Sequence, residues 1–597
     1  METKSRAAYI QEKYRQARNK RQTKDGIWKE LDAFDRNQQW DLQNAPAWLP
    51  KPVTNYIHLV KYTKRASFAV ENPVAKLRPV SPKGVQAVDL MNKAYEDTFD
   101  RIKMRKVIRE NIETAKLLGT GIAHIYWNEL TEGRMGTTVL GDEGFQYTGE
   151  IGIKEIEPST FYPDPNAFCI EECDFIIIRE RKASSWIEAN PKFSKNIDKK
   201  VDIDSSNPEE RGEIYLRDYD SNTDRERLVD FISFYERTAN SEGGYTYTVT
   251  YMANNKILLD KEKLRPNRYP FAILHDFKQR QDFWGMSTCQ FILDNQKIIN
   301  KIESIIAMLG ILLQNPQKIV TKSSGINPRK VAKYGNAPQQ VWETNDGDPS
   351  KSIHYVNPPN IPPVLLNMLE QAKGNIREIT GLTESYMGQN VGSLQTSSGV
   401  QALIDRSTMR DRDQMYDVEL YVEELTKLLI DFMTTYYEEE RQIRILDKTT
   451  DEVQFLPFVG AEFKDLAYDV AVDVSSKAPV TRMREMQEAK ELLGMQGQYG
   501  DNYPVQILKP QEAVKMMNLV HGNEIIERMN TEELQNKTQE AMNVAQMMAE
   551  ALTSGVDPNE VMQMGMAMYE QMENPQAAAM QPGAPTTANP QNIPQNA

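Results

Sequence analysis

The residue types that most often carry out catalysis or bind metals are few and scattered in this sequence. The five histidines are His58, His124, His275, His354 and His521. The three cysteines are Cys169, Cys173 and Cys289. Cys169 and Cys173 are close enough in sequence to share a metal ion, but zinc sites usually add a second Cys or His pair, and none follows nearby. We therefore expect structural roles for these side chains and no metal site.

The acidic residues form no catalytic pattern. The stretch 345–348, Asn-Asp-Gly-Asp, hints at a calcium loop, but the glutamate that would close it is missing, so a turn is expected. The three glutamates at 438–440 are typical of a solvated face rather than of acid–base chemistry. Asp276, Asp282 and Asp294 are too scattered to indicate a nuclease site. There is also no Gly-Lys pair, and hence no phosphate-binding GxxxxGK(S/T) loop. We predict no catalytic residues, no cofactor and no enzymatic activity.

Composition and charge narrow the possible classes of protein. The 597 residues are 40% hydrophobic and 26% charged, which suffices to bury a core, and the net charge is −14. An acidic chain is a poor match for a protein that holds nucleic acid through clustered Lys and Arg. Three sparse cysteines favour a reducing compartment. The N-terminus has no apolar stretch of the signal-peptide type, and no run of about 18 apolar residues predicts a membrane span.

The stretch 381–407 is unusual because its middle is almost free of charge. Between Thr383 and Ile404 the only charged residue is Glu384, and Gly, Ser, Gln and Asn dominate. A helical pattern leads into this stretch and a longer one leads out. It is therefore expected to be a neutral, flexible loop between two helices.

The elements on either side of this loop have a distinctive order. Residues 294–315 predict a helix with one apolar stripe, formed by Ile298, Ile302, Ile305, Leu309 and Leu312. Residues 316–362 are rich in Pro and Gly, carry a net charge of +3, and contain strand candidates at 318–320, 340–343 and 354–356. A second helix follows and ends at Gly381, a plausible C-cap. The two helices should form an antiparallel hairpin with the insert at its tip.

The rest of the chain indicates a mixed α+β protein. Residues 25–130 are mostly helical in pattern, 121–280 are rich in strands, and 443–478 return to strands. After the neutral loop, about forty residues read as one helix, far longer than the usual 11–12 residues or so. Residues 481–573 are helical and acidic, with a net charge of −8. The uncharged tail 574–597 is expected to be disordered.

Two terminal segments leave alternatives open. Residues 1–24 carry eight basic and two acidic groups, so they are either a solvated helix end or a contact for DNA or an acidic partner. The Met-rich segment 542–572 either adds a helical layer to an assembly, or belongs to the core of its own chain, or is disordered.

Several stretches, taken in this order, resemble the portal proteins of tailed bacteriophages, over roughly residues 25–520. They are LLGTGIAHIYWN (117–128), FYPDPNAF (161–168), FWGMSTCQFILDNQKIINKI (283–302) and IREITGLTESYMGQNVGSLQTSSGVQALIDRS (376–407). No single motif is specific, and the information lies in the order of helix, insert, helix, loop and long helix. The two ends of the chain do not match the family pattern residue by residue.

The resemblance implies a portal-like division of the chain. Its parts are a basic arm (1–24), an α+β wing (25–284), stem helix 1 (285–315), a small β-containing clip (316–362), stem helix 2 (363–382), a tunnel loop (383–398), a long wing helix (399–442), wing strands (443–480), a helical crown or barrel (481–573) and the disordered tail (574–597). The family implies a homo-oligomeric ring, usually of twelve subunits, at a capsid vertex of the virion, assembled in the host cytoplasm. Implied partners are double-stranded DNA in the channel, major capsid and scaffolding proteins, terminase and the head-to-tail adaptor, with no membrane.

The same resemblance nominates site residues. The tunnel loop would line the channel with Glu384, Met387, Gln389, Asn390, Ser393 and Gln395. Neutral groups there would touch moving DNA without holding it; the alternative is a mobile surface loop. Lys297 and Lys301 are expected to form shallow positive rings in the channel, or else to be ordinary solvated lysines. Partner contacts on the clip are expected at Lys318, Lys322, Arg329 and Lys330.

Two other classes of protein remain as alternatives. One is a different structural virion protein, such as a connector or minor head protein, which usually lacks the helix–insert–helix–loop–helix order. The other is a nucleic-acid enzyme, which would need convergent acidic or nucleotide-binding motifs that the sequence does not show. Quaternary state separates them, because a portal forms a large closed ring and an enzyme a small oligomer with a cleft.

Overall fold

The computed structural model describes most of the first three quarters of the chain. The described residues are 3–41, 46, 48–70, 74–80, 84–129, 149–194, 228–241, 243–356, 360, 362–382, 397–446, 453–464 and 468–473, with scattered positions between 490 and 546. The chain divides into two units, one of residues 1–445 and 453–476, the other of 446–452 and 477–597. The account below concerns the first unit. The predicted crown and tail lie almost wholly outside the described residues.

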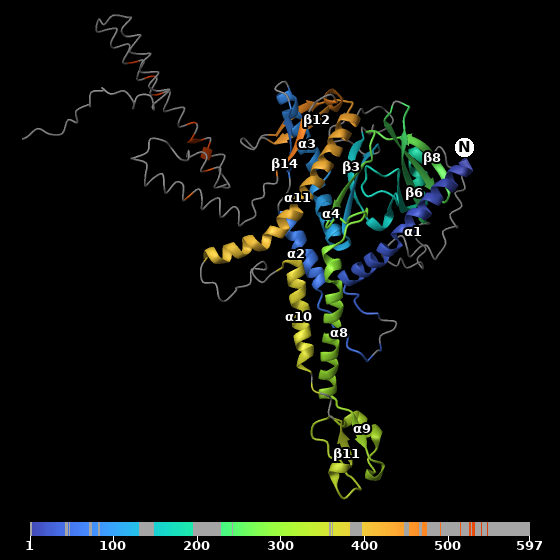
Figure 1. The fold of residues 1–597 in the computed structure, drawn as a ribbon, viewed down its shortest axis with the longest axis vertical. Helices are drawn as coiled ribbons and strands as arrows, with labels where there is room; N and C mark the ends of the chain where they lie inside the picture. Colours follow the sequence, from blue (N-terminus) through green and yellow to red (C-terminus); the bar gives the residue numbers. More distant parts are fainter. Residues whose placement is uncertain are drawn as a thin grey trace, which may run out of the picture. The chain divides into compact units, whose positions relative to one another are not determined.

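Helices and antiparallel sheets alternate in this unit, in agreement with an α+β class (Figure 1). The longer helices are α1 (Thr3–Asp35), α2 (Tyr56–Val70), α3 (Val85–Arg101), α4 (Met104–Leu118), α8 (Thr288–Gln314), α10 (Pro363–Thr380) and α11 (Ser397–Tyr436). The shorter ones are α5 (Ser184–Ala189), α6 (Pro191–Ser194) and α9 (Pro328–Tyr334). None of the described helices combines the length and apolarity that crossing a membrane requires.

The strands form two main sheets and three small ribbons. A five-stranded sheet has the order β4 (Phe161–Pro163), β5 (Phe175–Ala183), β6 (Leu228–Ala239), β7 (Tyr245–Ala253), β8 (Lys256–Lys263). A three-stranded sheet has the order β3 (Glu150–Ile156), β2 (Thr120–Asn128), β9 (Phe271–His275). The ribbons pair β1 (Val74–Pro79) with β14 (Tyr468–Asp473), β10 (Lys318–Val320) with β11 (Ile353–Tyr355), and β12 (Arg441–Leu446) with β13 (Val453–Phe458).

Helix α11 is the spine of the largest hydrophobic cluster. Val418, Val422, Leu425 and Leu429 follow the spacing of one helical face, and all four are buried with residues of α3, α4 and the three-stranded sheet. The predicted length of about forty residues is confirmed, but the helix ends at Tyr436 rather than at 442. The glutamates at 438–440 explain the earlier end, because negative charge is unfavourable at a helix C-terminus.

The basic N-terminal segment is part of helix α1. Residues 3–24 are the first part of a 33-residue helix that packs on the five-stranded sheet. Arg6 forms an ion pair with Glu236 at 2.5 Å, and Lys24 one with Asp282 at 3.1 Å. The buried guanidinium of Arg21 donates to the main-chain carbonyls of Pro158, Ser159 and Phe161. Part of the positive charge is thus paired within the chain, and both alternatives, a solvated helix end and a contact for DNA or an acidic partner, stay predictions.

Two glycines allow the end of α4 to touch the segment that leads into α8. Gly119 follows α4 with a φ of +92°, where a side chain is strained. A Cβ on Gly119 would lie 2.5 Å from the carbonyl oxygen of Gly285, and one on Gly285 only 2.3 Å from that of Gly119. Both obstructing atoms are main chain and cannot rotate away. The contact therefore fixes where α8 starts relative to the sheet.

We expect Gly119→Ala to lower the free energy of unfolding by about 3 kcal/mol or more, because it adds backbone strain and a main-chain clash. Gly26→Ala, in α1 with nothing within 4 Å of the added Cβ, should instead be neutral or stabilise by up to about 1 kcal/mol. Thermal and urea unfolding of both variants at one protein concentration measures the difference. Equal effects at the two positions would contradict the close-approach explanation.

Candidate functional site: a helix pair and the insert at its tip

Helices α8 and α10 form the predicted antiparallel pair, and the chain between them makes a small insert at the far end (Figure 1). Asn375 of α10 donates to the side chain of Asn295 of α8 at 3.4 Å. Ile302 and Leu369 are buried in the same cluster. Helix α10 ends at Gly381, which has a φ of +71° and is the C-cap that the sequence predicts.

The start of α8 lies between the two that were predicted, Asp294 from the helical pattern and residue 285 from the family resemblance. The helix begins at Thr288, because the side chain of Ser287 accepts a hydrogen bond from the Gln290 N–H and caps it. The Asp276 carboxylate also accepts from both the N–H and the hydroxyl of Thr288, at 2.5 and 2.6 Å. Ser287 and Asp276 thus accept hydrogen bonds from the first N–H groups of α8, and the helix dipole favours the negative charge of Asp276 there. We call this N-terminal end of α8 its root.

Asp276 is also the centre of a buried polar network that joins three helices. Lys116 of α4 donates to the other oxygen of Asp276 at 2.7 Å and to Gln414 of α11 at 2.8 Å. The side chains of Lys116 and Asp276 are 5% and 0% exposed. The sequence analysis missed this role, because Lys116 and Asp276 are 160 residues apart. The sequence feature that could have indicated this role is an aspartate shortly before the Ser-Thr pair at which α8 starts.

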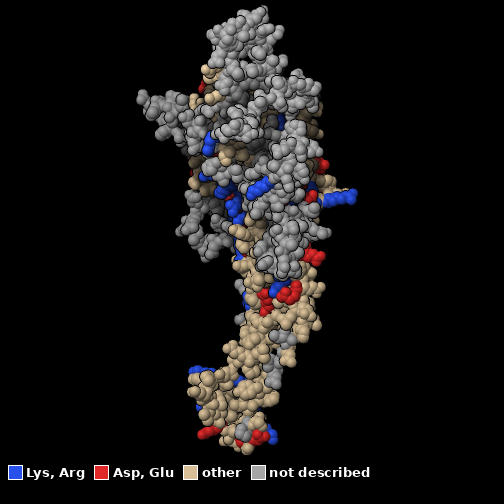
Figure 2. All heavy atoms as spheres, turned by 90° about the vertical axis from the view of Figure 1, so that its left-hand side faces the viewer, with Lys and Arg blue, Asp and Glu red and all other residues tan. Residues whose placement is uncertain are grey.

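The single apolar stripe predicted for α8 is only partly correct. Ile302 and Leu309 are buried, but Ile298 and Ile305 are 39% and 43% exposed, as is Phe291 at 42%. On α10 the exposed apolar residues are Val364, Leu366, Met368 and Ile379, at 44–63%. Figure 2 shows this side of the pair, on which Lys, Arg, Asp and Glu form only small groups. The pair therefore carries apolar surface that the described part of the chain does not cover.

The two lysines predicted to face a channel have different surroundings. Lys297 forms an ion pair with Glu30 of α1 at 2.7 Å and a longer one with Asp294 at 3.7 Å. Lys301 is exposed. The charge of Lys297 is therefore largely neutralised inside the chain, and Lys301 is the better candidate for a channel-facing cation.

The insert has very little hydrophobic core. Among residues 316–356, whose side chains are described except for Pro349, Val331 is the only buried hydrophobic residue. Hydrogen bonds replace the core: Asp346 accepts from Thr321 and Ser352, and Thr344 contacts Ser352. The stretch 345–348 is thus a turn, as expected. Lys318–Val320 forms a strand as predicted, 353–355 replaces 354–356, and the strand predicted at 340–343 is wrong.

The exposed surface of the insert is basic and aromatic. Lys322, Arg329 and Lys330 are exposed, and Lys318 is half-buried. The ammonium groups of Lys318 and Lys330 lie 5.8 Å from the ring centres of Tyr355 and Trp342, respectively. All four residues nominated for partner contacts are thus on one small module, although Lys318 is less accessible than the others.

The neutral loop lies outside the described residues. This applies to all six residues nominated to line a channel, which are Glu384, Met387, Gln389, Asn390, Ser393 and Gln395. The described chain resumes at Ser397, where α11 begins. Their role stays a prediction.

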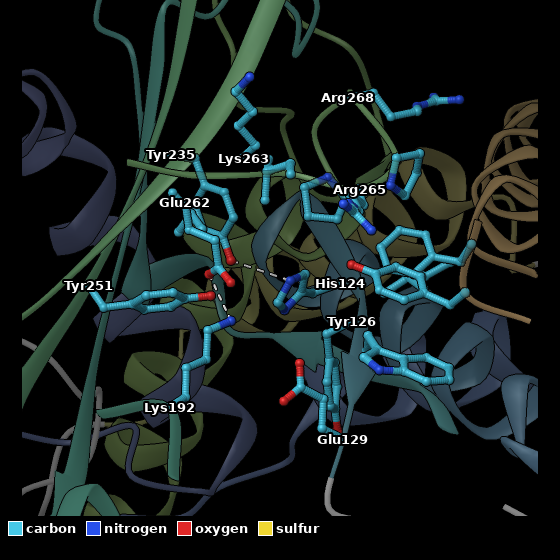
Figure 3. Close-up of a pocket in the computed structure, with 18 residues that line it drawn as sticks. His124, Tyr126, Glu129, Lys192, Tyr235, Tyr251, Glu262, Lys263, Arg265 and Arg268 are labelled. Atoms are coloured by element: carbon cyan, nitrogen blue, oxygen red, sulfur yellow. Dashed lines mark hydrogen bonds and ion pairs between the residues drawn. The ribbon is translucent and has the colours of Figure 1, made fainter. Parts of the chain in front are cut away.

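A pocket between the two main sheets is the nearest approach to a catalytic site (Figure 3). His124 points into it, and Tyr235 lies 3.5 Å from the His124 Nε2. Burial, with the positive charge of Lys154 nearby, lowers the pKa of His124 to about 3, so the imidazole is neutral at physiological pH. Glu262, which also lines the pocket, is paired with Lys192 at 2.7 Å. Among the described residues, the contacts join His124 to Tyr235 and Glu262 to Lys192, so they do not pair this histidine with a carboxylate.

The cysteine pair shows no sign of activation. Burial raises the pKa of Cys173 to about 12, and its thiol contacts the carbonyl of Cys169 at 3.4 Å. Within the described ranges, no group of three or more His, Cys, Asp or Glu side chains could hold a metal ion.

Comparison with known protein families places the fold and site in context. The family model described as phage SU10 portal protein matches residues 142–530, more than half of the chain. A search of curated proteins finds no significant match.

The buried network gives a test of how the root of α8 is held. We expect Asp276→Asn to destabilise the protein by about 3–5 kcal/mol, because the substitution leaves the charge of Lys116 buried and unpaired. Asp294→Asn, at a side chain that is 91% exposed, should change stability by less than about 0.5 kcal/mol. Denaturant unfolding followed by tryptophan fluorescence measures both, and a mild effect of Asp276→Asn would show that the ion pair is not the anchor of the helix.

Proposed function

The chain belongs to the phage portal protein family, and from this premise we propose that it forms a closed ring, most simply of twelve copies, at one vertex of the capsid. The family is structural rather than enzymatic. In the proposed ring the α8–α10 pairs are the stem around a central channel, through which double-stranded DNA enters during packaging and leaves during ejection.

The observation that carries this proposal is the apolar surface that the described residues of one chain leave uncovered. Phe291, Ile298 and Ile305 recur every seven residues along α8, and α10 adds further exposed apolar side chains. Soluble monomers rarely expose large contiguous apolar patches. A module with as little core as the insert is also difficult to stabilise alone. Neighbouring copies around a ring would cover both, because each copy meets two others.

The charge of the chain suits a conduit. Each phosphate contact adds a salt-dependent increment to DNA binding, and a ring multiplies such contacts by the number of copies. A net charge of −14 and a loop without Lys or Arg would keep the number of such phosphate contacts low. We propose that the loop 383–398 lines the narrowest part of the channel and that Lys301 supplies at most a shallow positive ring.

The remaining parts receive their roles from the family. The basic insert, 316–362, is proposed as the clip that docks first the terminase and later the head-to-tail adaptor. The mixed body, 25–284 with 399–480, is proposed as the wing that contacts capsid and scaffolding proteins. Residues 481–573 are proposed as a crown facing the capsid interior.

Quaternary structure tests the proposal directly. Native mass spectrometry should give a closed oligomer of about twelve copies of the 68.4 kDa chain, and negative-stain class averages should show a central hole. A connector-like protein would give a different assembly. A compact dimer or tetramer without a channel would overturn the portal function.

The channel role of the loop can be tested by adding charge. The double variant Ser393→Lys and Gln395→Lys should form the same ring but package DNA several-fold more slowly at low salt, with recovery as salt rises, because each copy gains two potential phosphate contacts. The matched control replaces the same two residues by Ala and should package at the parent rate. Unchanged packaging by the Lys variant would place the loop outside the DNA path.

A further inference from the structure

Four consecutive residues of α8 show what lies on each side of the helix. Successive residues of an α-helix are about 100° apart around its axis, so four of them sample every direction. Asn295 accepts a hydrogen bond from α10 at 3.4 Å, and Gln296 accepts one from the first N–H of α2 at 2.9 Å. Lys297 forms an ion pair with α1 at 2.7 Å, and Ile298 is 39% exposed. Three sides of α8 therefore meet α10, α2 and α1, and the fourth is open.

Two of these sides carry helices whose outer faces are polar. Helices α10 and α1 lie on opposite sides of α8, because Asn295 and Lys297 are about 200° apart around it (Figure 1). The outer face of α10, opposite its buried residues, consists of exposed Asn367, Glu370, Gln371, Gly374 and Glu378. The exposed residues along the outer face of α1 include Asn19, Gln22, Gly26 and Lys29. Both faces are suited to contact with water.

The outer face of α2, on the third side, is apolar. Ile57 and Val60 are buried in the cluster that α2 shares with α8. On the opposite side of the helix Leu59 and Tyr62 are 42% and 53% exposed, and Ala66, four residues further, is exposed as well. These three residues have the spacing of one helical face. We call them the α2 face.

The open side of α8 is apolar too. Phe291 and Ile298 are seven residues, or two turns, apart and are 42% and 39% exposed. The ring of Phe277, 39% exposed, stands edge-on to Phe291 with the ring centres 5.4 Å apart. We call these three residues the Phe291 face. Because Ile298 follows Gln296 by two residues, this face points away from α2.

The two apolar faces are at nearly the same level along α8. The thiol of Cys289 contacts the carbonyl of Ile57 at 3.9 Å, which marks where α2 touches α8. Phe291 and Leu59 each follow one of these two residues by two positions, a rise of about 3 Å along its own helix. Each face is therefore within about one helical turn of the contact between α2 and α8.

We infer that the α2 face of one copy packs onto the Phe291 face of the next copy. The inference rests on the proposed ring, in which the helix pairs run along the ring axis. A copy in such a ring meets water on two sides, at the channel and at the outer surface, and a neighbouring copy on the other two. The polar outer faces of α10 and α1 suit water, and the two apolar faces suit the neighbours.

The symmetry of a ring agrees with the positions of the two faces. Rotation about the ring axis moves a copy sideways without moving it along the axis, so only groups at similar levels meet. Two different faces on opposite sides of one chain make a head-to-tail contact, which closes a ring when repeated. Tyr62, Phe277 and Phe291 would form its centre, and aromatic side chains contribute large areas to interfaces.

Cysteine cross-linking between copies tests the contact. In a Cys169→Ser background, which leaves only buried cysteines, Leu59→Cys is combined with Phe291→Cys in one chain. A short bifunctional maleimide should join each copy to the next and give a ladder of covalent multimers on a denaturing gel. The matched control combines Leu59→Cys with Ile305→Cys, which is 43% exposed on the same side of α8 but about 21 Å further along it. The control should give at least tenfold less multimer.

Each outcome of the experiment decides something. A ladder with position 291 and little with 305 supports the contact. Rings in negative stain that give no ladder, or equal ladders for both pairs, overturn the contact and leave the ring intact. A cross-link confined within single chains would show that the two faces do not lie on opposite sides of the chain, and it overturns the contact as well. If the parent chain forms no ring at all, the proposed function fails together with this contact.

A second cysteine pair keeps the test decisive if the first pair disturbs assembly. Tyr62→Cys combined with Phe277→Cys replaces the other two aromatic residues of the proposed centre, and negative stain checks that the variant still forms rings. These rings should give the same ladder, and its absence would overturn the contact.

Discussion

The buried ion pair between Lys116 and Asp276 is the interaction on which the position of the helix pair depends. Asp276 cannot remain charged in a dry interior without a partner, and Lys116 cannot either. One carboxylate oxygen of Asp276 accepts from Thr288 at the start of α8, and the other accepts from Lys116 of α4. Gln414 extends the same network to α11. The orientation of α8 is thus linked to the two helices that carry the largest hydrophobic cluster, and a displacement of the pair would have to break buried hydrogen bonds.

Further along α8 and α10, toward the insert, buried contacts become fewer and exposed apolar side chains more numerous. The pair leaves the body of the unit and meets progressively fewer partners of its own chain. Near its root, α8 buries Ile292, Leu293 and Ile299, but toward the insert Ile311 and Leu313 are 46% and 62% exposed. The insert itself is held by hydrogen bonds around Asp346 rather than by apolar packing. In the proposed ring, contacts with neighbouring copies would bury this exposed apolar surface and stabilise the helix pair.

Local sequence patterns predicted many of the helices and strands, but they could not predict how these elements pack against one another. The pattern around Ile302 and Leu309 predicts a helix, and Gly381 marks where the next helix ends, since both depend on neighbours within a few residues. The same pattern cannot tell that Ile298 and Ile305 stay exposed, because the width of the buried face is set by how closely α10 packs. The prediction of a strand at 340–343 was wrong for a related reason. Val341 has strand propensity but no adjacent strand to pair with, and it is 87% exposed. Lys116 and Asp276 acquire their roles only through contacts between distant parts of the chain.

The distribution of positive charge is compatible with the proposed DNA conduit, although the chain has 71 Lys and Arg residues. Many of these cations are committed to carboxylates of the same chain. Arg6 binds Glu236, Lys64 binds Asp411 and Lys297 binds Glu30, each joining elements that are far apart in sequence. A cation paired in this way contributes to packing and is largely lost to phosphate binding, because an approaching phosphate would have to displace a carboxylate already in contact. The exposed basic groups of the insert lie at the opposite end of the pair from this body. If the insert is the docking surface that we propose, its exposed basic groups would serve protein partners, while the paired cations of the body would add little to DNA binding.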